Sequence, residues 1–536
     1  MRKPPAKFML STLSRSLGLW LMLSAAPVMA QTSTAQVGAL KAAAERALAT
    51  SPEVAARFNA YRAAIDAVDA GQAAWRPKVD LTASVGRDSD RFSSNLNSNV
   101  TSNTPTTQSL NRSGVALNAT QLLWDGLGTR NEADRLGHDK LTRYFEFLDV
   151  TAQTALEATR AHVDVQRYRR LVKLAEDNYV QHKYASLQIQ SRFKAGVGRG
   201  VDAEQANARL ALAESNLATE VANLHDVTAR YQRVVGASPS SAPSDIGKMA
   251  LPLPATAEAA ASTAVKQSSS VSASIEALRA ARSSVESRQS AFQPRVEARL
   301  RGGVGSNLDG VRDQRNNTTA EIVMNWNLYN GGADQARVRQ QVNLLGQAAD
   351  LRDKACRDTR QTALIAYNDT RKLIEQLVYL DRNSLAIEKA RDAYRQQFDI
   401  GQRSLLDLLN AENEVYTAKR AYTNAEADLG LAQIRTHAAM GQLTAQLGMA
   451  PSTGYNGTDE AAGWAAGDDA PAARCPGLVA DVKSSDKTEL DVRAQRIAAA
   501  VAPIVAPIVS PSAAAATAPM PMATPSTPST PPTKKK

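Results

Sequence analysis

Phe193-Lys194-Ala195-Gly196 returns about 205 residues later as Phe398-Asp399-Ile400-Gly401, and this repeat decides the fold of the chain. At the same spacing, Leu123-Trp124-Asp125-Gly126 returns as Leu328-Tyr329-Asn330-Gly331. Similarity over so long a period indicates two copies of one structural unit.

The repeat continues toward the N-terminus. Trp75-Arg76-Pro77-Lys78-Val79 matches Phe292-Gln293-Pro294-Arg295-Val296 at an offset of about 217 residues, so one loop of the first copy is about a dozen residues longer. Each copy is predicted to run helix, strand, strand, long helix, shorter helix. We place the first copy at residues 31–240 and the second at residues 241–450.

The predicted strands alternate residues of two kinds with a period of two. One face is apolar and consists of Val79, Leu81, Ala83, Val85, Val115, Leu117, Ala119, Val296, Ala298, Leu300, Ile322, Met324, Trp326 and Leu328. The other is polar or charged and consists of Lys78, Asp80, Thr82, Ser84, Asn118, Thr120, Arg295, Glu297, Arg299, Arg301, Glu321, Asn325 and Asn327. This pattern indicates membrane-barrel strands, although a soluble hairpin with one hydrated face shows it too. Interfacial aromatics are expected at the strand ends, at Trp75, Trp124 and Tyr329.

The helices favour the membrane-barrel interpretation. From about Thr129 to Phe193 only Gly137 interrupts the pattern, which predicts a helix of about 65 residues and roughly 100 Å. The shorter helix of the second copy carries a seam with steps of four and three: Ala411, Val415, Ala418, Tyr422, Ala425, Leu429, Ala432, Thr436, Ala439 and Leu443. The first copy repeats the seam as Ala206, Leu210, Ala213, Leu217, Leu224, Val227, Tyr231 and Val234, with Glu220 as the single misfit. Sustained heptads require coiled-coil packing, and the alanines allow close approach.

The number of strands has a consequence for assembly. No run of about 18 apolar residues follows the N-terminal segment, so a membrane could be crossed there only by a closed barrel. Four strands cannot close a barrel, and the interior of an eight-stranded barrel is filled by side chains. Three chains would supply twelve strands around a lumen. We therefore expect a homotrimer if the protein conducts.

Both ends of the chain differ from the repeats. Basic residues, an apolar run from Leu17 to Leu23 and a small residue at Ala30 predict a secretory signal peptide at residues 1–30, which points to a bacterial envelope. Residues 451–536 are rich in Ala, Pro, Thr and Ser and end in three lysines, so they are predicted to form a disordered tail. An inert spacer explains this tail better than electrostatic binding of peptidoglycan or a partner.

Several classes of function are not indicated. The formal net charge is +10, but Lys and Arg alternate with Asp and Glu along the helices, which argues against a nucleic-acid partner. Cys356 and Cys475 show neither metal-ligand spacing nor a disulfide framework, and the five histidines are scattered. The glycine-rich residues 196–200 lack the context of a phosphate loop, so we interpret them as an interhelical turn. We expect no enzyme, no metal and no cofactor.

The repeat, Trp75-Arg76-Pro77 and the segment from Gly401 to Asn413 resemble TolC-type outer-membrane factors over about residues 36–446. The resemblance implies an α+β membrane protein of the cell outer membrane. Its trimeric twelve-stranded β-barrel, with four strands per chain, would continue as a periplasmic α-helical coiled-coil barrel. Leu328 to Ala333 and Leu409 to Asn413 are similar to the subgroup for type I secretion. In that subgroup an inner-membrane ABC transporter and a periplasmic adaptor pass an unfolded protein into the duct.

In this family the turns between long and shorter helices form a periplasmic aperture. By position, the resemblance assigns aperture roles to Val201, Asp202, Phe398, Arg403, Asp407 and Asn410. The family has an acid in place of Asn410 and a tyrosine in place of Phe398, so its cation sensitivity and closing bonds do not carry over directly. Asp202 and Asp407 also fit ordinary first-turn acids of helices, and both roles are compatible. Arg403 is the expected partner of Asp407.

Three functions remain open at this point. The first is a passive exit duct for type I secretion, and the second is a small-molecule efflux duct served by a proton-driven pump. The third is a soluble fibrous coiled-coil protein without a barrel. If the charged strand face lines a lumen, Lys78, Arg295, Arg299 and Arg301 outnumber Asp80, Glu297 and Glu321, which predicts a modest preference for anions.

Overall fold

The computed structural model describes residues 29–92, 106–241, 252–450, 457, 459–471, 475–477 and 485–501. The predicted signal peptide lies outside these residues apart from Met29 and Ala30, and so does much of the predicted tail. The chain divides into two compact units, Met1–Val479 and Ala480–Lys536. The described part of the second unit contains the helix α10 (Lys487–Val501).

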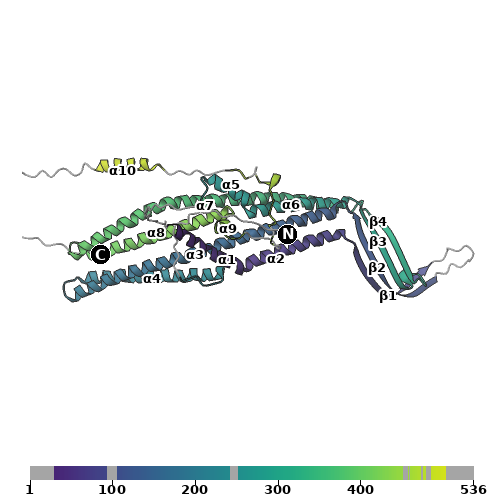
Figure 1. Cartoon of the computed structure of the whole chain (residues 1–536), viewed down its shortest axis with the longest axis horizontal. Helices are drawn as coiled ribbons and strands as arrows, with labels where there is room; N and C mark the ends of the chain where they lie inside the picture. Colours follow the sequence, from purple (N-terminus) through teal and green to yellow (C-terminus); the bar gives the residue numbers. More distant parts are fainter. Residues whose placement is uncertain are drawn as a thin grey trace, which may run out of the picture. The chain divides into compact units, whose positions relative to one another are not determined.

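The two copies of the repeat have the same order of elements (Figure 1). The first contains α2 (Pro52–Gln72), η1 (Ala73–Trp75), β1 (Lys78–Phe92), β2 (Thr106–Trp124), α3 (Gly128–Lys194) and α4 (Gly200–Val235). The second contains α6 (Ser269–Gln289), η2 (Ser290–Phe292), β3 (Arg295–Ser306), η3 (Leu308–Gly310), β4 (Asn316–Asn325), α7 (Ala333–Asp399) and α8 (Leu405–Ala439). The predicted order of helix, strand, strand, long helix and shorter helix is confirmed. Both long helices, α3 and α7, have 67 residues.

Each copy starts with the same local signals. Ser51 and Ser268 are the N-caps of α2 and α6, and each hydroxyl accepts a hydrogen bond of 3.4 Å from the backbone N–H three residues later. Both helices end in a short 3-10 turn. Arg76 (φ −90°, ψ 153°) and Gln293 (φ −102°, ψ 154°) are then extended, because each precedes a proline, and this conformation leads into the strands.

The helices pair as antiparallel hairpins, α3 with α4 and α7 with α8 (Figure 1). Along both shorter helices none of the predicted seam residues is exposed, and Ala206, Ala213, Ala411 and Ala418 are buried. Burial of alanine at these positions is what close coiled-coil packing requires. Among the helices of the described residues, none combines the length and the apolar character needed to cross a bilayer.

The four strands form one antiparallel sheet in chain order, β1-β2-β3-β4. One row of residues in register across it is Val79, Ala119, Leu300 and Ala320. The next row is Lys78, Thr120, Arg299 and Glu321. The predicted division into an apolar and a charged face is therefore confirmed. One detail differs, because β4 ends at Asn325, so Trp326 and Leu328 follow the strand instead of belonging to it.

Three shorter helices pack against the middle of the hairpins. α1 (Met29–Thr50) buries Leu40 in a cluster with Ile434 of α8, and α9 (Leu443–Gln446) adds Leu443 to the same cluster. α5 (Ala257–Gln267) buries Ala264 in another cluster with Tyr367 of α7. Figure 1 shows these helices beside the central part of the hairpins, away from the sheet.

Part of the predicted disordered tail is ordered and packs on the helices. We call residues 459–471 and 475–477 the C-terminal strap; it includes η4 (Gly467–Asp469). Trp464 of the strap stands edge-on against Phe145 of α3, with ring centroids 5.0 Å apart, and its Nε1 donates to Glu276 of α6 at 2.7 Å. Asp469 pairs with two arginines of α6. The prediction of disorder is therefore wrong for these residues, because an aromatic and several acids anchor them despite the surrounding Ala/Pro-rich composition.

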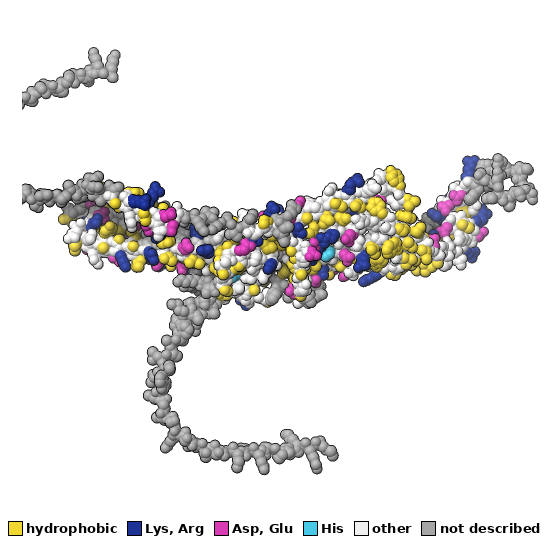
Figure 2. Space-filling view, turned by 90° about the horizontal axis from the view of Figure 1, so that it is seen from above, with side chains coloured by type: hydrophobic (Ala, Val, Ile, Leu, Met, Phe, Trp, Pro, Cys, Tyr) yellow, Lys and Arg dark blue, Asp and Glu magenta, His cyan; other side chains and the backbone are white. Residues whose placement is uncertain are grey.

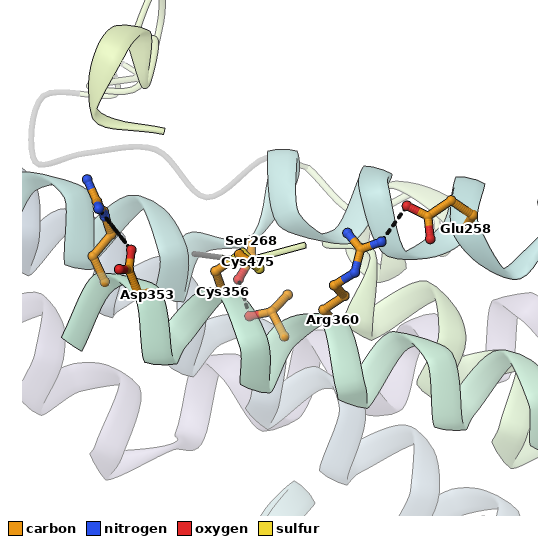
Figure 3. The surroundings of a disulfide bond; sticks show 8 residues. Glu258, Ser268, Asp353, Cys356, Arg360 and Cys475 are labelled. Carbon is orange, nitrogen blue, oxygen red and sulfur yellow. Dashed lines mark hydrogen bonds and ion pairs between the residues drawn. A yellow bond between two sulfur atoms is a disulfide. The ribbon is translucent and has the colours of Figure 1, made fainter. Parts of the chain in front are cut away.

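A disulfide joins the strap to α7. The Sγ atoms of Cys356 and Cys475 are 2.03 Å apart, and the Cα atoms are 6.2 Å apart. Figure 3 shows this bond on α7 beside Arg360, which points toward Glu258 of α5 and pairs with it. Neither the spacing nor the context of the two cysteines indicated this bond, and their redox state could not be predicted from the sequence. The two cysteines are 119 residues apart, and only the tertiary fold brings them together.

Candidate functional site

The two interhelical turns lie together at the end of the hairpins away from the sheet (Figure 1). Gly196 (φ +75°) and Gly401 (φ +79°) reverse the chain in the left-handed region, where other residues meet a Cβ clash. Val201 is 66% exposed at the start of α4, and Asp202 follows it in the first turn of that helix. The other four predicted aperture residues lie between the end of α7 and the second turn of α8.

Arg403 and Asp407 approach each other as predicted. Arg403 Nη1 lies 3.6 Å from Asp407 Oδ2, its Nε donates to Gln397 at 3.1 Å, and its guanidinium stacks 4.8 Å from the ring centroid of Tyr394. Ser404 is the N-cap of α8: its hydroxyl accepts from the Asp407 N–H at 3.3 Å and donates to Asp407 Oδ2 at 2.9 Å. Asp407 therefore completes a capping arrangement and also faces Arg403.

Phe398 and Asn410 have different surroundings. Phe398 is buried in an apolar cluster with Ile189 of α3 and Leu409 of α8, and the Arg192 guanidinium lies 5.0 Å from its ring centroid. Within one subunit its ring thus packs the two hairpins together. Asn410 Oδ1 accepts a hydrogen bond of 2.8 Å from Arg209 Nη2 of α4. The Asn410 amide thus forms a polar link between α8 and α4.

Further polar links join the hairpins at residues that the sequence pattern did not indicate as a site. Glu220 of α4, whose side chain is only 2% exposed, accepts from Arg420 Nη2 of α8 at 2.7 Å. Arg395 of α7 donates to Gln181 of α3 at 2.9 Å. The sequence did contain an indication of the Glu220–Arg420 link, because a buried carboxylate at a coiled-coil seam position needs a polar or charged partner. The partner itself could not be found from spacing, because Arg420 lies in the other repeat.

A buried carboxylate and an uncharged histidine complete this region. Glu412 of α8 is bound by Arg391 at 3.1 Å and by Arg395, both from α7. Burial lowers the pKa of His182 on α3, the opposing effect of Glu412 is smaller, and Arg209 lowers this pKa further. His182 is therefore neutral near pH 7. The charges that join the hairpins are those of acids and arginines.

The polar face of the sheet carries paired charges. Glu297 pairs with Arg295 at 2.6 Å and with Arg299 at 2.9 Å, so these three side chains share a face as predicted. The strand register adds Asp88, Asp90 and Arg112 to that face, and the β3–β4 turn adds Asp309. With them the face holds five basic residues, Lys78, Arg112, Arg295, Arg299 and Arg301, against six acids, Asp80, Asp88, Asp90, Glu297, Asp309 and Glu321. The excess of basic over acidic residues on this face, from which the preference for anions was predicted, is therefore absent.

Aromatic side chains gather where the helices meet the sheet. Trp75 belongs to η1, Trp124 ends β2, and Tyr329 follows β4; all three are exposed. Trp326, which was assigned only to the strand, joins them, and its Nε1 donates to the Phe292 carbonyl at 3.1 Å. Figure 2 shows hydrophobic side chains covering this part of the molecule, with charged side chains more frequent toward the far end of the sheet. Such a belt suits a membrane interface.

Comparison with known proteins identifies the class. A sequence model of the outer membrane efflux protein family matches residues 43–237 and 260–442, and the chain belongs to that family. It is similar to the outer membrane efflux protein BepC of Brucella suis biovar 1, with 26% identity over 403 residues, which cover 74% of this chain and 84% of BepC. It is also similar to outer membrane protein TolC of Escherichia coli K12, with 25% identity over 150 residues, 28% of this chain and 30% of TolC.

Solved structures show the same fold at low sequence identity. CusC superposes with a TM-score of 0.66 at 15% identity, over 75% of this chain and 92% of CusC. The outer membrane protein VceC of Vibrio cholerae gives a TM-score of 0.64 at 16% identity, over 76% of this chain and 96% of VceC. The protein is accordingly an outer-membrane channel protein with its helical part in the periplasm, not an enzyme. A soluble fibrous protein is excluded by this membership.

Proposed function

We infer that three copies of this chain form a passive exit duct, closed in the outer membrane as a twelve-stranded barrel. The observation that carries this proposal is the sheet. Within the described residues, β1 and β4 each have a strand partner on one side only, while Leu81 and Ile322 on the apolar face are 70% and 73% exposed. In lipid, an unpaired strand edge costs several kcal/mol per backbone group, so the edges must pair between subunits. Three copies are the smallest number that leaves a lumen.

The helical tips would form the closable end of this duct. Val201, Asp202, Phe398, Arg403, Asp407 and Asn410 are proposed to surround a periplasmic aperture, with α8 of each copy held to α4 by Arg209–Asn410 and Arg420–Glu220. An exposed pair such as Arg403–Asp407 contributes about 0–1 kcal/mol, and threefold repetition multiplies it. Closure of that strength can be overcome by binding of a periplasmic adaptor, which is the expected partner.

The cargo is proposed to be an unfolded protein supplied by an inner-membrane ABC transporter. The support is the resemblance of residues 328–333 and 409–413 to the type I secretion subgroup. A small-molecule cargo supplied by a proton-driven pump is the second candidate. The observation in its favour is the similarity to BepC, an outer membrane efflux protein that is matched over 84% of its length.

A deletion strain separates the two candidates. Loss of one or more polypeptides from the culture medium, with unchanged tolerance to dyes and antibiotics, would support type I secretion. Increased sensitivity to small molecules with an unchanged secreted protein profile would support efflux instead. Crosslinking in intact cells, followed by purification through this chain, should recover the adaptor in both cases and an ABC transporter only in the first.

A further inference from the structure

The turn between β3 and β4 folds back over the polar face of the sheet. Leu308 in this turn is only 7% exposed, although it lies beyond the end of β3. Gly114 of β2 stands opposite Gly305 of β3, and the register puts Gly114 on the same face as Thr120. A Cβ on Gly114 would overlap Leu308 Cδ2, and one on Gly305 would lie 2.9 Å from it. Two facing glycines thus form a seat for Leu308.

Polar contacts hold the same turn in place. Asp309 accepts hydrogen bonds from Arg301 Nη2 at 2.7 Å and from Asn317 Nδ2 at 2.9 Å, and both donors stand on the polar face. Asn307 Nδ2 donates to the Asn111 carbonyl of β2 at 2.8 Å. A Cβ on Gly310 would lie 3.3 Å from Asp88 Oδ2 of β1. Hydrogen bonds therefore hold the turn to β2, β3 and β4, and Gly310 brings it close to β1.

The backbone of the turn has a specific conformation. Asn307 (φ 50°), Asp309 (φ 52°) and Asp313 (φ 64°) occupy the left-handed region without being glycine. Asn and Asp adopt this conformation more readily than other non-glycine residues because their short side chains bond to the nearby backbone, as Asn307 Oδ1 does by accepting from the Asp313 N–H at 2.8 Å. An ordinary hairpin turn continues in the direction of its two strands. This turn instead folds back and places its side chains on the polar face of the sheet.

We propose that this turn is a constriction at the mouth of the duct opposite the helical tips, and that Leu308 and Asp309 set its width. The proposal rests on the function proposed above, in which the polar face lines a lumen shared by three copies. Three turns then project toward one axis. Asp309 of the turn is paired with Arg301 of β3, and Asp88 of β1 with Arg112 of β2 at 3.3 Å, so the charges in these pairs are balanced. The constriction sorts hydrophilic solutes by size, with little discrimination by sign.

The test is conductance of the purified full-length protein in planar bilayers. Leu308→Ser removes the side chain that fills the glycine seat, and should raise single-channel conductance about 1.5- to 3-fold and admit larger polyethylene glycols. Val304→Ser is the matched control, because Val304 lies at the same end of β3 but opposite Val115 on the apolar face, where it is 64% exposed. Its conductance should equal that of the wild type. Asp309→Asn keeps the shape of the side chain, removes its charge and should give a smaller rise.

The outcomes separate this inference from the proposed function. Wild-type protein that forms no channel would refute both. Wild-type channels together with assembled Leu308→Ser and Asp309→Asn channels of unchanged conductance and exclusion size would refute the constriction alone. If Leu308→Ser does not assemble, as shown by loss of heat-modifiable migration, Asp309→Asn decides the question by itself.

Discussion

Cys356 of α7 and Cys475 of the C-terminal strap are bonded, with their Cα atoms 6.2 Å apart. Cys356 lies inside the region that the family model matches, whereas Cys475 lies beyond its end at residue 442. Strap contacts reach Phe145 of α3 and Glu276 of α6, so the bond secures a segment that touches both copies of the repeat. An oxidising periplasm is where such a bond is expected to persist.

Cys475→Ser should release the strap. The bond closes a loop spanning 119 residues, for which chain entropy gives about 4–5 kcal/mol as an upper value. We expect the free energy of unfolding to fall by about 2–4 kcal/mol, seen as a lower midpoint of thermal unfolding, and rapid proteolysis between residues 459 and 477. Reduction of the wild type should reproduce both effects and should leave the serine variant unchanged. A variant as protease-resistant as the wild type would mean that the noncovalent contacts suffice.

Docking of the strap should weaken in acid. Burial alone raises the pKa of Glu276, but hydrogen bonds from His138 and Trp464 and the charge of Arg279 outweigh it, so the pKa lies below the ordinary 4.5. Hydrogen bonds from Arg282 and Arg279 hold the pKa of Asp469 below 3.8. A carboxyl group whose pKa is lowered by docking stabilises the docked strap fully at pH values above its ordinary pKa. This stabilisation is lost as the pH falls through the lowered pKa of the docked state, because the carboxyl group then becomes protonated.

Quenching of Trp464 fluorescence in the wild-type protein, whose disulfide is intact, measures this effect. Trp464 should be protected at neutral pH and become accessible below about pH 4. Subtracting the signal of a matching Trp464→Phe protein removes the contribution of the other tryptophans. In Glu276→Gln, protection should be weaker at neutral pH and depend less on acid. Equal protection of Trp464 at both pH values would argue against the assigned role of the carboxylates.

Sequence alone predicts most of the fold because its signals are local. The prolines after Arg76 and Gln293 and the two-residue alternation locate the strands, and the heptads locate the hairpins. Contacts between distant segments leave no such signal. Trp464 is the only aromatic in the strap, and its partner Glu276 lies 188 residues earlier, so neither periodicity nor composition could pair them. Leu308 looks like an ordinary turn residue until the register shows Gly114 beneath it.

Arg403→Ser should loosen the tips. The pair with Asp407 is 3.6 Å apart and its side chains are 44% and 39% exposed, so each subunit loses only about 0–1 kcal/mol. In planar bilayers the variant should conduct more than the wild type, with assembly and thermal stability unchanged. Asp407→Ala should reduce any block by divalent cations added on the periplasmic side. If Arg403→Ser channels conduct no better than wild type, Arg403 and Asp407 do not close the aperture and serve only to cap α8.

The Glu220–Arg420 pair should have a larger effect. Arg420→Ala leaves a carboxylate buried without its charged partner, which we expect to cost about 1–3 kcal/mol after allowing for the exposure of Arg420. Combining it with Glu220→Leu, which also removes the acid from the seam, should restore part of that stability. Thermal unfolding of the wild type, both single variants and the double variant gives the coupling energy. Additive losses would mean that the two residues do not act as a pair.

Crosslinking of the sheet edges tests most directly whether three chains close one barrel. Thr82→Cys on β1 and Thr319→Cys on β4 introduce thiols near the two edges, while both native cysteines are already bonded. A flexible bismaleimide applied to outer membranes should yield linked dimers and trimers of the double variant and no larger product, and either single variant should yield no trimer. A ladder that continues beyond three chains, or protein that remains uncrosslinked, would contradict the closed twelve-stranded barrel.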